Sequence, residues 1–525
     1  LGNDYDPTFP YFGANFWEDW EKTAHFEIFE TDKITKYESN AGLKIHGNWS
    51  RALDQKSLAF FARGEYGNKE FEYKLFPNRS FSKYNNFILR NSGQDFSSTM
   101  FRDLLMQNLV EDLDLDLMAG RPAIVFLNGQ YWGIQNIREK LNEDMIAAHH
   151  NLLPDEINLL ENDGAIVEGT NEKYQQLISY VTNNNLSNNS YYTVVKHLMQ
   201  VDNYIDYELA QIYYANNDWP GNNIKYWSAQ NDSSRWRWLI FDTDFGFGLF
   251  DDNAHKLNSL TEALEPNGPN WPNPPWSTLL LRRLLMNPQF KNDFINRFAD
   301  LSNSIFRREV VLSKIDSLRN IYSPEIERHI AKYDAFNLSQ WTNNVNYLRT
   351  FANSRIQFLR LYFLQYFGLE STSIVNLNVN DKQQGNIKIN RLLVNSYPWN
   401  GVYFKNVPVS VTAVPKNGYK FLRWEGKLNS DSVSITIMPD GLDSLTAVFA
   451  SDSSYGTIVI NEINYNSAAS FDTDDWVEFY NSSQKPINIS GWIFKDEDDS
   501  HSFTFPNNTI IQPDDYLVLC VDTAL

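Results

Sequence analysis

Two neighbouring segments decide how this chain is interpreted: NDWPGNNIKYW (217–227) and WRWLIFDTDFGFG (236–248). Asp218 stands five residues before Asn223, and a short β-rich run then leads to Asp242 and Asp244. Carboxylate and amide oxygens are ligands that divalent cations prefer, and a further carboxylate can orient an attacking hydroxyl group. The pattern therefore predicts a site for phosphoryl transfer, although short clusters of Asn, Asp and Gly also form ordinary acidic turns.

Composition and charge narrow the possible classes of protein. The 525 residues suggest about three domains, and contents of 42% hydrophobic and 15% aromatic residues suffice for folded cores. The formal net charge of −20 argues against nucleic acid and anionic membranes as partners. Cys520 is the only cysteine, which excludes an internal disulfide and a cysteine metal site. No run reaches the roughly 18 apolar residues that span a bilayer, so we expect no transmembrane segment.

The patterning along the chain predicts three domains: 1–370, 371–450 and 457–525. The first mixes strand and helix patterns. Beyond Glu370 the composition changes sharply, and short alternating runs with turn signals predict strands without helices. The segment SDSSYG (451–456) is expected to be a linker between the two all-β modules.

Within residues 1–370 we expect a strand-rich first part followed by mostly helical segments. The expected strands are FEIFE, AGLKIHGNW, KSLAFFARG, FEYKLF and NNFILRNS. The expected helices cover 99–117, 142–151, 206–216 and, with breaks, 277–367. Asn128-Gly129 predicts a tight hairpin turn between two β-rich runs.

The segment 251–276 is rich in Asn, Pro and Asp and contains EPNGPNWPNPPW. It directly follows the acidic string and is long for a plain connection. Two interpretations stand side by side: a loop that shapes a substrate site, and a solvated surface loop.

Taken together, residues 1–370 resemble the spore-coat-H (CotH) kinase family of atypical protein kinases. The resemblance rests on strings in a characteristic order: KIHGNWSRALDQKSLAF, FILRNSGQDFSSTMFRDLL, VFLNGQYWGIQNIREKLNEDMI, NNDWPGNNIKYW and WRWLIFDTDFGFG. The resemblance implies an α+β, two-lobed, protein-kinase-like domain that uses ATP with Mg²⁺ or Mn²⁺.

The resemblance also implies roles for the acidic and amide residues. Asp218 matches the catalytic-loop aspartate, and Asn223 matches the metal-holding amide. The metal aspartate is either Asp242 or Asp244: the literal DFG string favours Asp244, whereas a DxD pattern leaves Asp242 open. Lys56 matches the strand lysine expected to contact phosphates, with an exposed strand lysine as the alternative.

Other residues are expected near the nucleotide. Gly47, Asn48, Ser50 and Arg51 occupy the place of a phosphate-cradling turn, although GNWSR is not a GxGxxG loop. Glu139 is a candidate ion-pair partner that orients Lys56, and Arg138 is a candidate phosphate contact. Both residues would equally suit a structural network.

The first C-terminal module contains AVPKNGYKFLRWEGKL and resembles the small β-repeats of bacterial surface proteins that are related to internalin B-repeats. Tyr419, Phe421 and Trp424 are then expected in its core. The second module, 457–525, resembles the lamin-tail domain, an immunoglobulin-like sandwich, on INEINYN, DWVEFYN, ISGW and LVLC. We expect this last module to be incomplete at its C-terminus.

An acidic turn precedes Trp476 in the second module and contains Asp472, Asp474 and Asp475. A calcium site and a solvated loop are the two interpretations, and the loop is preferred. The two modules together suggest an exported protein.

These observations combine into one hypothesis: a metal-dependent atypical kinase that phosphorylates Ser or Thr hydroxyls of a partner surface or secreted protein. The alternative is an inactive secreted or cell-surface adhesion or scaffold protein with a pseudokinase domain. The presence of the acid, the amide and the metal aspartates favours activity. Hydrolase classes find little support, because the chain contains neither a GxSxG nor an HExxH motif.

Overall fold

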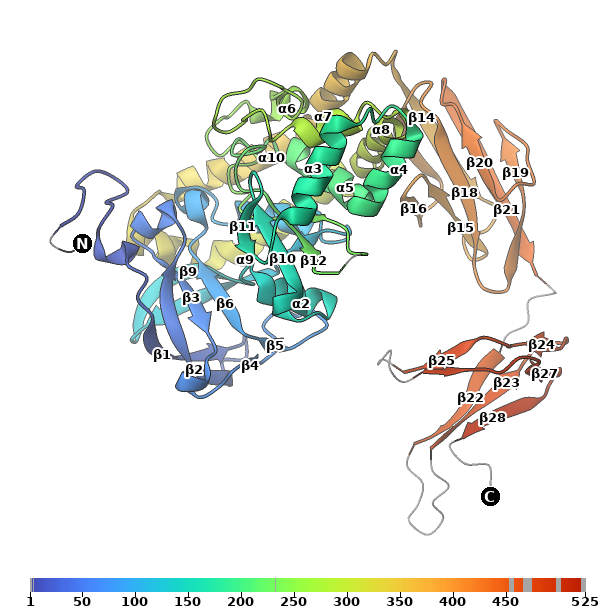
Figure 1. Ribbon diagram of the computed structural model, residues 1–525, viewed down its shortest axis with the longest axis horizontal. Coiled ribbons are helices and arrows are strands. Elements are labelled where there is room, and N and C mark those ends of the chain that lie inside the picture. Colours follow the sequence, from blue (N-terminus) through green and yellow to red (C-terminus); the bar gives the residue numbers. More distant parts are fainter. Residues whose placement is uncertain are drawn as a thin grey trace, which may run out of the picture. The chain divides into compact units, whose positions relative to one another are not determined.

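The structure is a computed structural model that describes residues 2, 4–231, 233–452, 458–465, 475–496 and 502–520. Its contacts divide the chain into two units, Leu1–Ser371 and Thr372–Leu525 (Figure 1). Asp472 and Asp474 of the acidic turn lie outside the described residues.

Two sheets organise the N-terminal unit. A six-stranded sheet, antiparallel throughout, has the order β1 (Lys22–Phe29), β2 (Thr35–His46), β3 (Ser57–Phe61), β6 (Asn86–Arg90), β9 (Gln130–Arg138) and β8 (Gly120–Leu127). A five-stranded sheet has the order β11 (Ala165–Glu168), β10 (Ile157–Glu161), β12 (Lys225–Ala229), β13 (Arg237–Ile240) and β7 (Asp116–Leu117). Strands β13 and β7 pair in parallel, and the other pairs of this sheet are antiparallel.

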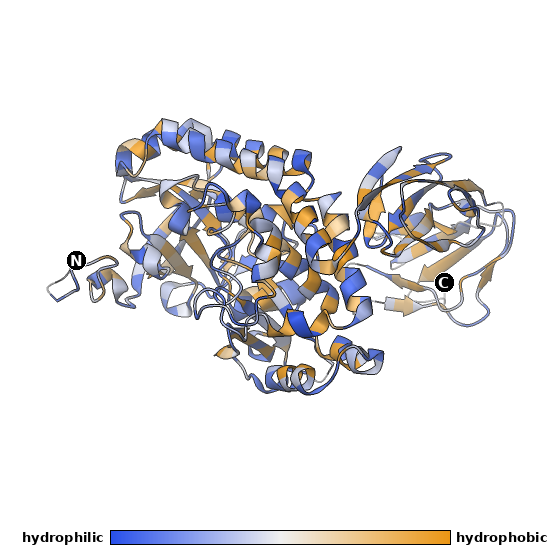
Figure 2. Ribbon diagram, turned by 90° about the horizontal axis from the view of Figure 1, so that it is seen from above, coloured by the Kyte–Doolittle hydropathy of each residue, from blue (hydrophilic) through white to orange (hydrophobic). Residues whose placement is uncertain are grey.

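Ten helices are described in the same unit, and they supply most of its second half. They are α1 (Arg102–Leu109), α2 (Glu143–His150), α3 (Glu172–Asn183), α4 (Asn189–Leu198), α5 (Val201–Tyr214), α6 (Ser259–Glu262), α7 (Leu279–Leu284), α8 (Pro288–Ser302), α9 (Arg308–Tyr333) and α10 (Leu338–Phe367). Figure 2 shows helices on which hydrophobic and hydrophilic residues alternate, as expected where only one face is buried. Most strand and helix regions expected from the sequence are present.

Each sheet has its own hydrophobic core. The six-stranded sheet buries an aromatic cluster in which Phe60 of β3 stacks on Phe87 of β6, with ring centroids 4.7 Å apart. In the five-stranded sheet, Leu159 of β10 and Trp227 of β12 pack with Ile146 of α2. The packing of these two cores therefore does not depend on the polar side chains between the sheets, which can form a functional site instead.

The hairpin expected at Asn128-Gly129 is present between β8 and β9. Both residues have positive φ, +50° and +75°, which is the backbone that a two-residue type I′ turn requires. The helix expected over 99–117 is shorter than predicted. It ends at Leu109, and Asp116 and Leu117 form β7 beside β13. The strand expected at FEYKLF is confined to β4 (Phe71–Glu72), which pairs with β5 (Lys83–Tyr84).

Helix α10 holds the end of α5, the helix that leads into the Asp218 loop. Its buried residues recur every three or four positions, and among them is Arg355. The Arg355 guanidinium donates to the carbonyl oxygens of Ile212 (2.7 Å) and Tyr213 (3.0 Å) at the C-terminal end of α5. Since the last carbonyls of a helix lack intrahelical donors, this buried cation completes the end of α5 and fixes where the loop begins.

The C-terminal unit is all-β in its described residues. Residues 372–451 form two four-stranded sheets, ordered β17 (Trp399–Phe404), β14 (Thr372–Val379), β21 (Leu442–Ser451), β19 (Tyr419–Gly426) and β16 (Leu392–Val394), β15 (Gly385–Ile389), β18 (Val409–Pro415), β20 (Ser434–Ile437). Trp424 is fully buried, as expected, whereas Tyr419 and Phe421 are only partly buried.

The last module contains a three-stranded sheet and two short strand pairs. The sheet has the order β22 (Ile458–Asn464), β23 (Trp476–Asn481) and β28 (Tyr516–Cys520), and the pairs are β24 (Ile487–Asn488) with β27 (Ile510–Ile511) and β25 (Ile493–Lys495) with β26 (Ser502–Thr504). Phe479, Phe505, Ile489 and Ile511 form its buried core.

Candidate active site

A cavity of about 930 Å³ in the N-terminal unit is lined by segments of both sheets. One wall comes from the six-stranded sheet: the end of β2 with the following turn, the start of β3, and β6 with its following loop. The other wall comes from the Asp218 loop, the start of β12 and the chain that follows β13. The expected residues Asp218, Asn223, Asp242 and Asp244 all line this one cavity.

Asp218 is buried and saturated with hydrogen bonds. Asn222 donates to both of its carboxylate oxygens at 2.9 Å, Asn223 donates to Oδ2 at 2.6 Å, and the Trp271 indole donates to Oδ1 at 2.9 Å. Burial raises the pKa of Asp218, and the negative charge of Asp242 adds to this, while the hydrogen bonds from Asn222 and Trp271 act in the opposite direction. An acid held in this way is suited to accept a proton.

Asn223 contacts Asp218 through its side-chain amide. Its φ is +52°, in the left-handed region that Asn tolerates better than most residues. Because its Nδ2 atom donates to Asp218, its Oδ1 atom is left as the acceptor or ligand atom.

Asp242 and Asp244 share one cation, the guanidinium of Arg90. Arg90 Nη2 lies 2.5 Å from Asp242 Oδ1 and 3.2 Å from Asp244 Oδ2. The Asp242 side chain is 42% exposed, whereas that of Asp244 is 3% exposed. Burial and the neighbouring Asp242 charge raise the pKa of Asp244 well above that of an ordinary aspartate, against the opposing charge of Arg90. Two carboxylates in this position require a positive charge close by.

The loop after β6 approaches Asp244 closely at Gly93. The Gln94 backbone N–H donates to Asp244 Oδ2 at 2.8 Å. A Cβ atom at Gly93, where φ is +60°, would lie 2.3 Å from the same oxygen and 2.8 Å from Arg90 Nη2. Only glycine therefore leaves room for the aspartate and the arginine together.

A buried ion pair beneath the cavity fixes this arrangement. Arg138 Nη1 donates to Asp103 Oδ2 at 2.7 Å, and Asp103 Oδ1 accepts from the Thr243 backbone and hydroxyl, both at 2.9 Å. Burial disfavours the charge of Asp103, but Arg138 and Arg90 outweigh it and hold its pKa well below the usual range. Since Thr243 stands between Asp242 and Asp244, the pair holds the backbone that carries both aspartates.

Basic residues line both walls of the cavity. Arg90, Lys140 and Lys225 line the cavity together with His46. Desolvation lowers the pKa of His46 to about 4, and the positive charges of Lys140 and Arg90 add to this effect. The cavity thus combines carboxylates, which are suited to cations, with cationic groups, which are suited to phosphates.

Of the residues expected near the nucleotide, Gly47, Asn48 and Ser50 line the cavity, whereas Arg51 and Lys56 do not. The Lys56 ammonium instead donates to the Leu53 carbonyl at 2.5 Å and lies 4.2 Å from the ring centroid of Phe16. Arg51 donates to backbone carbonyls, that of Gly47 at 2.7 Å among them. Desolvation by these neighbours also lowers the pKa of Lys56.

The structure does not bring Arg138 and Glu139 to the cavity lining either. Arg138 is the partner of Asp103. Glu139 accepts from Arg79 Nε at 3.0 Å and from the Ala119 backbone at 2.7 Å, and it contacts His149 Nε2 at 2.9 Å. These partners correspond to the structural network that the sequence left open, and the expected ion pair between Glu139 and Lys56 is replaced by them.

Sequence reasoning gave no site role to Arg90, Gly93, Lys140, Lys225 or Trp271. Arg90 and Gly93 lie in the string FILRNSG, which was recognised but not assigned a function. Trp271 lies in the Asn- and Pro-rich segment 251–276. The interpretation of this segment as a loop that shapes a substrate site is the sequence signal that could have identified it.

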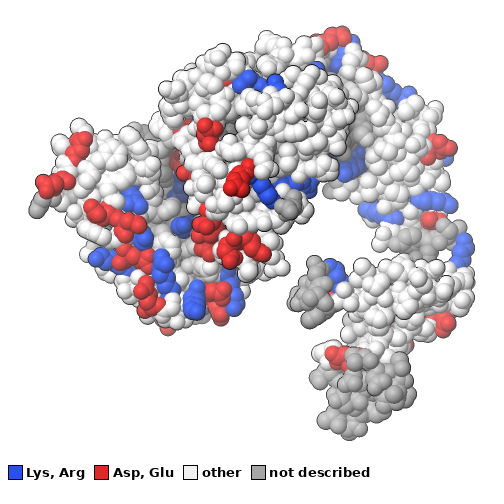
Figure 3. Space-filling view, viewed as in Figure 1, with Lys and Arg blue, Asp and Glu red and all other residues white. Residues whose placement is uncertain are grey.

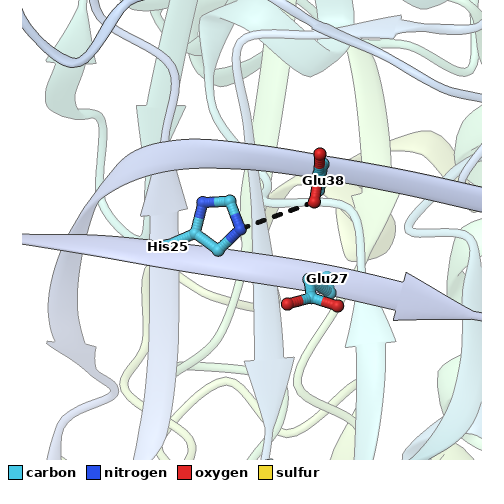
Figure 4. A group of neighbouring side chains, drawn as sticks. All are labelled: His25, Glu27 and Glu38. Atoms are coloured by element: carbon cyan, nitrogen blue, oxygen red, sulfur yellow. Dashed lines mark ion pairs between the residues drawn. The ribbon is translucent and has the colours of Figure 1, made fainter. Parts of the chain in front are cut away.

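A second cluster of possible metal ligands lies away from this cavity. Ligand atoms of His25, Glu27 and Glu38, on β1 and β2, lie within 4.8 Å of one another (Figure 4). All three side chains are exposed, and none of them lines the cavity. Figure 3 shows acidic and basic side chains interspersed on the part of the surface formed by β1 and β2, so the cluster belongs to a mixed charged surface.

The comparison with known families covers the part of the chain that carries this cavity. The family model for CotH kinase protein matches residues 43–359, which include every residue of the cavity discussed above from His46 to Trp271. The chain therefore belongs to the CotH kinase protein family. The divergent InlB B-repeat domain matches residues 376–453, and the lamin tail domain matches residues 451–524. No curated protein matches the chain. Among the described residues, no helix is long and apolar enough to cross a membrane.

Proposed function

We propose that this chain is a metal-dependent atypical protein kinase that transfers the γ-phosphate of ATP to Ser or Thr hydroxyls of a partner protein. The observation that carries the proposal is the convergence of Asp218, Asn223, Asp242 and Asp244 on one cavity in a chain of the CotH kinase protein family. The lining of this cavity by two separate sheets supports a two-lobed, kinase-like arrangement.

The acidic and amide residues of the cavity fit a divalent cation. Asn223 can offer Oδ1, and Asp242 and Asp244 offer carboxylate oxygens, which are the hard ligands that Mg²⁺ and Mn²⁺ prefer. The need for a positive charge between two desolvated carboxylates is already visible in the contacts of Arg90. A bound divalent cation would neutralise the phosphate charge that develops during transfer.

The basic residues of the cavity fit the phosphates of ATP. Arg90, Lys140 and Lys225 bring three cationic groups to the same cavity, and Ser50 adds a hydroxyl. Lys56 is replaced in this role by these residues, because its ammonium is directed to Phe16 and to the Leu53 carbonyl. Charge neutralisation and positioning account for most of the catalysis in phosphoryl transfer, so these residues supply the main requirement.

Asp218 serves the acceptor. Its carboxylate orients the Ser or Thr hydroxyl and accepts its proton as the hydroxyl oxygen attacks the γ-phosphorus. The two appended β-modules favour a secreted or cell-surface protein with a protein substrate. No specific observation favours the alternative of an inactive scaffold, since the acid, the amide and both aspartates are present in the cavity.

The experiment compares wild-type protein with Asp218→Asn, using ATP and either Mg²⁺ or Mn²⁺. Mass spectrometry detects phosphate on the protein itself and on dephosphorylated casein. A matched control is Asp112→Asn, which makes the same change at an exposed acid on the loop after α1. Phosphate on wild-type and control samples but not on Asp218→Asn supports the proposal. No phosphate on the wild-type sample, together with no change in its melting temperature on adding ATP and either metal, refutes it.

A further inference from the structure

The hydrogen bonds of Asp218 leave no open position for an acceptor hydroxyl. Its Oδ1 atom accepts from Asn222 and Trp271, and its Oδ2 atom accepts from Asn222 and Asn223. A general base must lie within hydrogen-bonding distance of the proton that it removes. One of the present donors must therefore give way before a hydroxyl can reach the carboxylate.

Trp271 differs from the two asparagines in a way that marks it as the donor that gives way. Asn222 and Asn223 belong to the same turn as Asp218, and both are only partly exposed. Trp271 comes from a segment 53 residues further along the chain, and its side chain is 59% exposed. Its indole can leave the carboxylate by rotating into solvent, without breaking the turn that holds Asp218.

The backbone around Trp271 is anchored, so displacing the indole requires only a rotation of the side chain. The Gly221 N–H donates to the Pro272 carbonyl at 2.6 Å, which ties this segment to the turn after Asp218. Asn273 is buried and donates to the Glu262 carbonyl at 2.7 Å. Gly221 also lies close to Pro274: a Cβ atom at Gly221 would be 2.1 Å from Pro274 Cδ.

We propose that Trp271 is an acceptor gate: its indole N–H occupies the position on Asp218 Oδ1 that the acceptor hydroxyl takes during transfer. This inference rests on the proposed function and adds a positioning residue to it. A protein segment that brings a Ser or Thr hydroxyl displaces the indole and gains the contact with Asp218. Water is a poor competitor, because it brings no further contacts to offset the loss of the indole hydrogen bond.

The same atoms change partners in transfer to a hydroxyl and in transfer to water. The acceptor oxygen forms a bond to the γ-phosphorus, the bond from that phosphorus to the bridging oxygen of ADP breaks, and the acceptor proton passes to Asp218. With water as acceptor the products are ADP and inorganic phosphate. The gate therefore predicts that the indole suppresses ATP hydrolysis more than it suppresses protein phosphorylation.

The experiment measures ATP hydrolysis without a protein acceptor, phosphate transfer to dephosphorylated casein, and the Kd for ATP with Mg²⁺. The variants are Trp271→Phe, which keeps a ring but removes the N–H donor, and Trp271→Ala. The matched control is Trp20→Phe, an exposed tryptophan that does not line the cavity. Since the site is exposed, folding should be preserved, and melting temperatures check this.

We expect Trp271→Phe to raise hydrolysis about fivefold, the factor that corresponds to losing one competing hydrogen bond. Trp271→Ala should raise it at least as much, Trp20→Phe should behave as wild-type protein, and the Kd for nucleotide should stay unchanged in all variants. Hydrolysis in Trp271→Phe at or below the wild-type rate, with wild-type protein active, overturns the gate but leaves the proposed function standing. Absence of both hydrolysis and transfer in every sample overturns the proposed function and the gate together.

Discussion

Gly93→Ala should damage the proposed cation site through two effects that a matched variant can separate. The first is backbone strain, since φ at Gly93 is +60° and an alanine in this left-handed region costs about 1–2 kcal/mol. The second is steric, because the new Cβ would lie 2.3 Å from Asp244 Oδ2. Asp244 cannot move aside cheaply, because the same oxygen accepts from the Gln94 backbone at 2.8 Å and contacts Arg90 at 3.2 Å.

Gly129→Ala is the matched control. Gly129 also has a positive φ, +75°, in the β8–β9 turn of the same sheet, and no atom lies within 4 Å of the position that its Cβ would take. Both variants should therefore lower the melting temperature of the N-terminal unit by a few degrees, about 2–4 °C per kcal/mol at most for a unit of this size. Only Gly93→Ala should lose metal-dependent nucleotide binding.

The assay is calorimetric titration of each variant with ATP in the presence of Mg²⁺ or Mn²⁺. Displacing one ligand oxygen should weaken binding by about tenfold or more, the equivalent of about 1.4 kcal/mol. Equal nucleotide affinity in Gly93→Ala and Gly129→Ala would refute the reasoning, because it would mean that Asp244 is free to move or takes no part in binding.

Four further predictions concern the charged residues of the cavity and the buried ion pair between Asp103 and Arg138. The raised pKa of Asp244 favours its protonated form, but Asp244 must be ionised to bind metal. The affinity for Mg²⁺ should therefore increase as pH rises. Asp244→Asn should remove this pH dependence in calorimetric titrations. The metal-free protein should at the same time lose stability as pH rises above 3.8, since the folded state holds this proton more tightly than the unfolded state does; thermal melting across the pH range checks the sign. Lys140→Ala and Lys225→Ala should weaken ATP binding severalfold, whereas Lys56→Ala should bind ATP as wild-type protein does. Weaker binding in Lys56→Ala than in the other two variants would contradict the proposed role of the lysines that line the cavity. Arg138→Ala should lower the free energy of unfolding by about 3–5 kcal/mol, because it removes the closer of the two cations beside the buried Asp103 carboxylate; chemical denaturation with no loss of stability would argue against this role.

The helix expected over 99–117 is shorter in the structure than its local sequence pattern predicts. Residues 102–109 have helical spacing and form α1, but the following DLDLDL alternates with a period of two. Alternation of that kind is typical of strands, and Asp116 and Leu117 do pair with β13. The partner strand lies more than a hundred residues away, so nothing nearby in the sequence identified it.

The acidic half of the site could be predicted because its residues are close together in the sequence. Asp218 and Asn223 share one turn, and Asp242 and Asp244 follow one short strand. A local sequence pattern therefore predicts all four as residues of one site. The basic half could not be predicted in the same way. Lys56 and Ser57 are neighbours at the start of a strand, where successive side chains point to opposite faces. Ser57 lines the cavity, and Lys56 consequently faces Phe16.

Arg90 supplies a positive charge beside Asp242 and the buried Asp244 when no divalent cation is bound. Its guanidinium contacts residues 152 and 154 positions away, so the sequence gives no local sign of the pairing. Asp242 and Asp244 would hold a divalent cation, whose positive charge would reduce their need for the Arg90 guanidinium. We then expect metal and phosphate to strengthen each other's binding, because each would remove a charge that the other leaves uncompensated. The affinity for ATP should accordingly depend on the metal far more than simple screening of the phosphates would require.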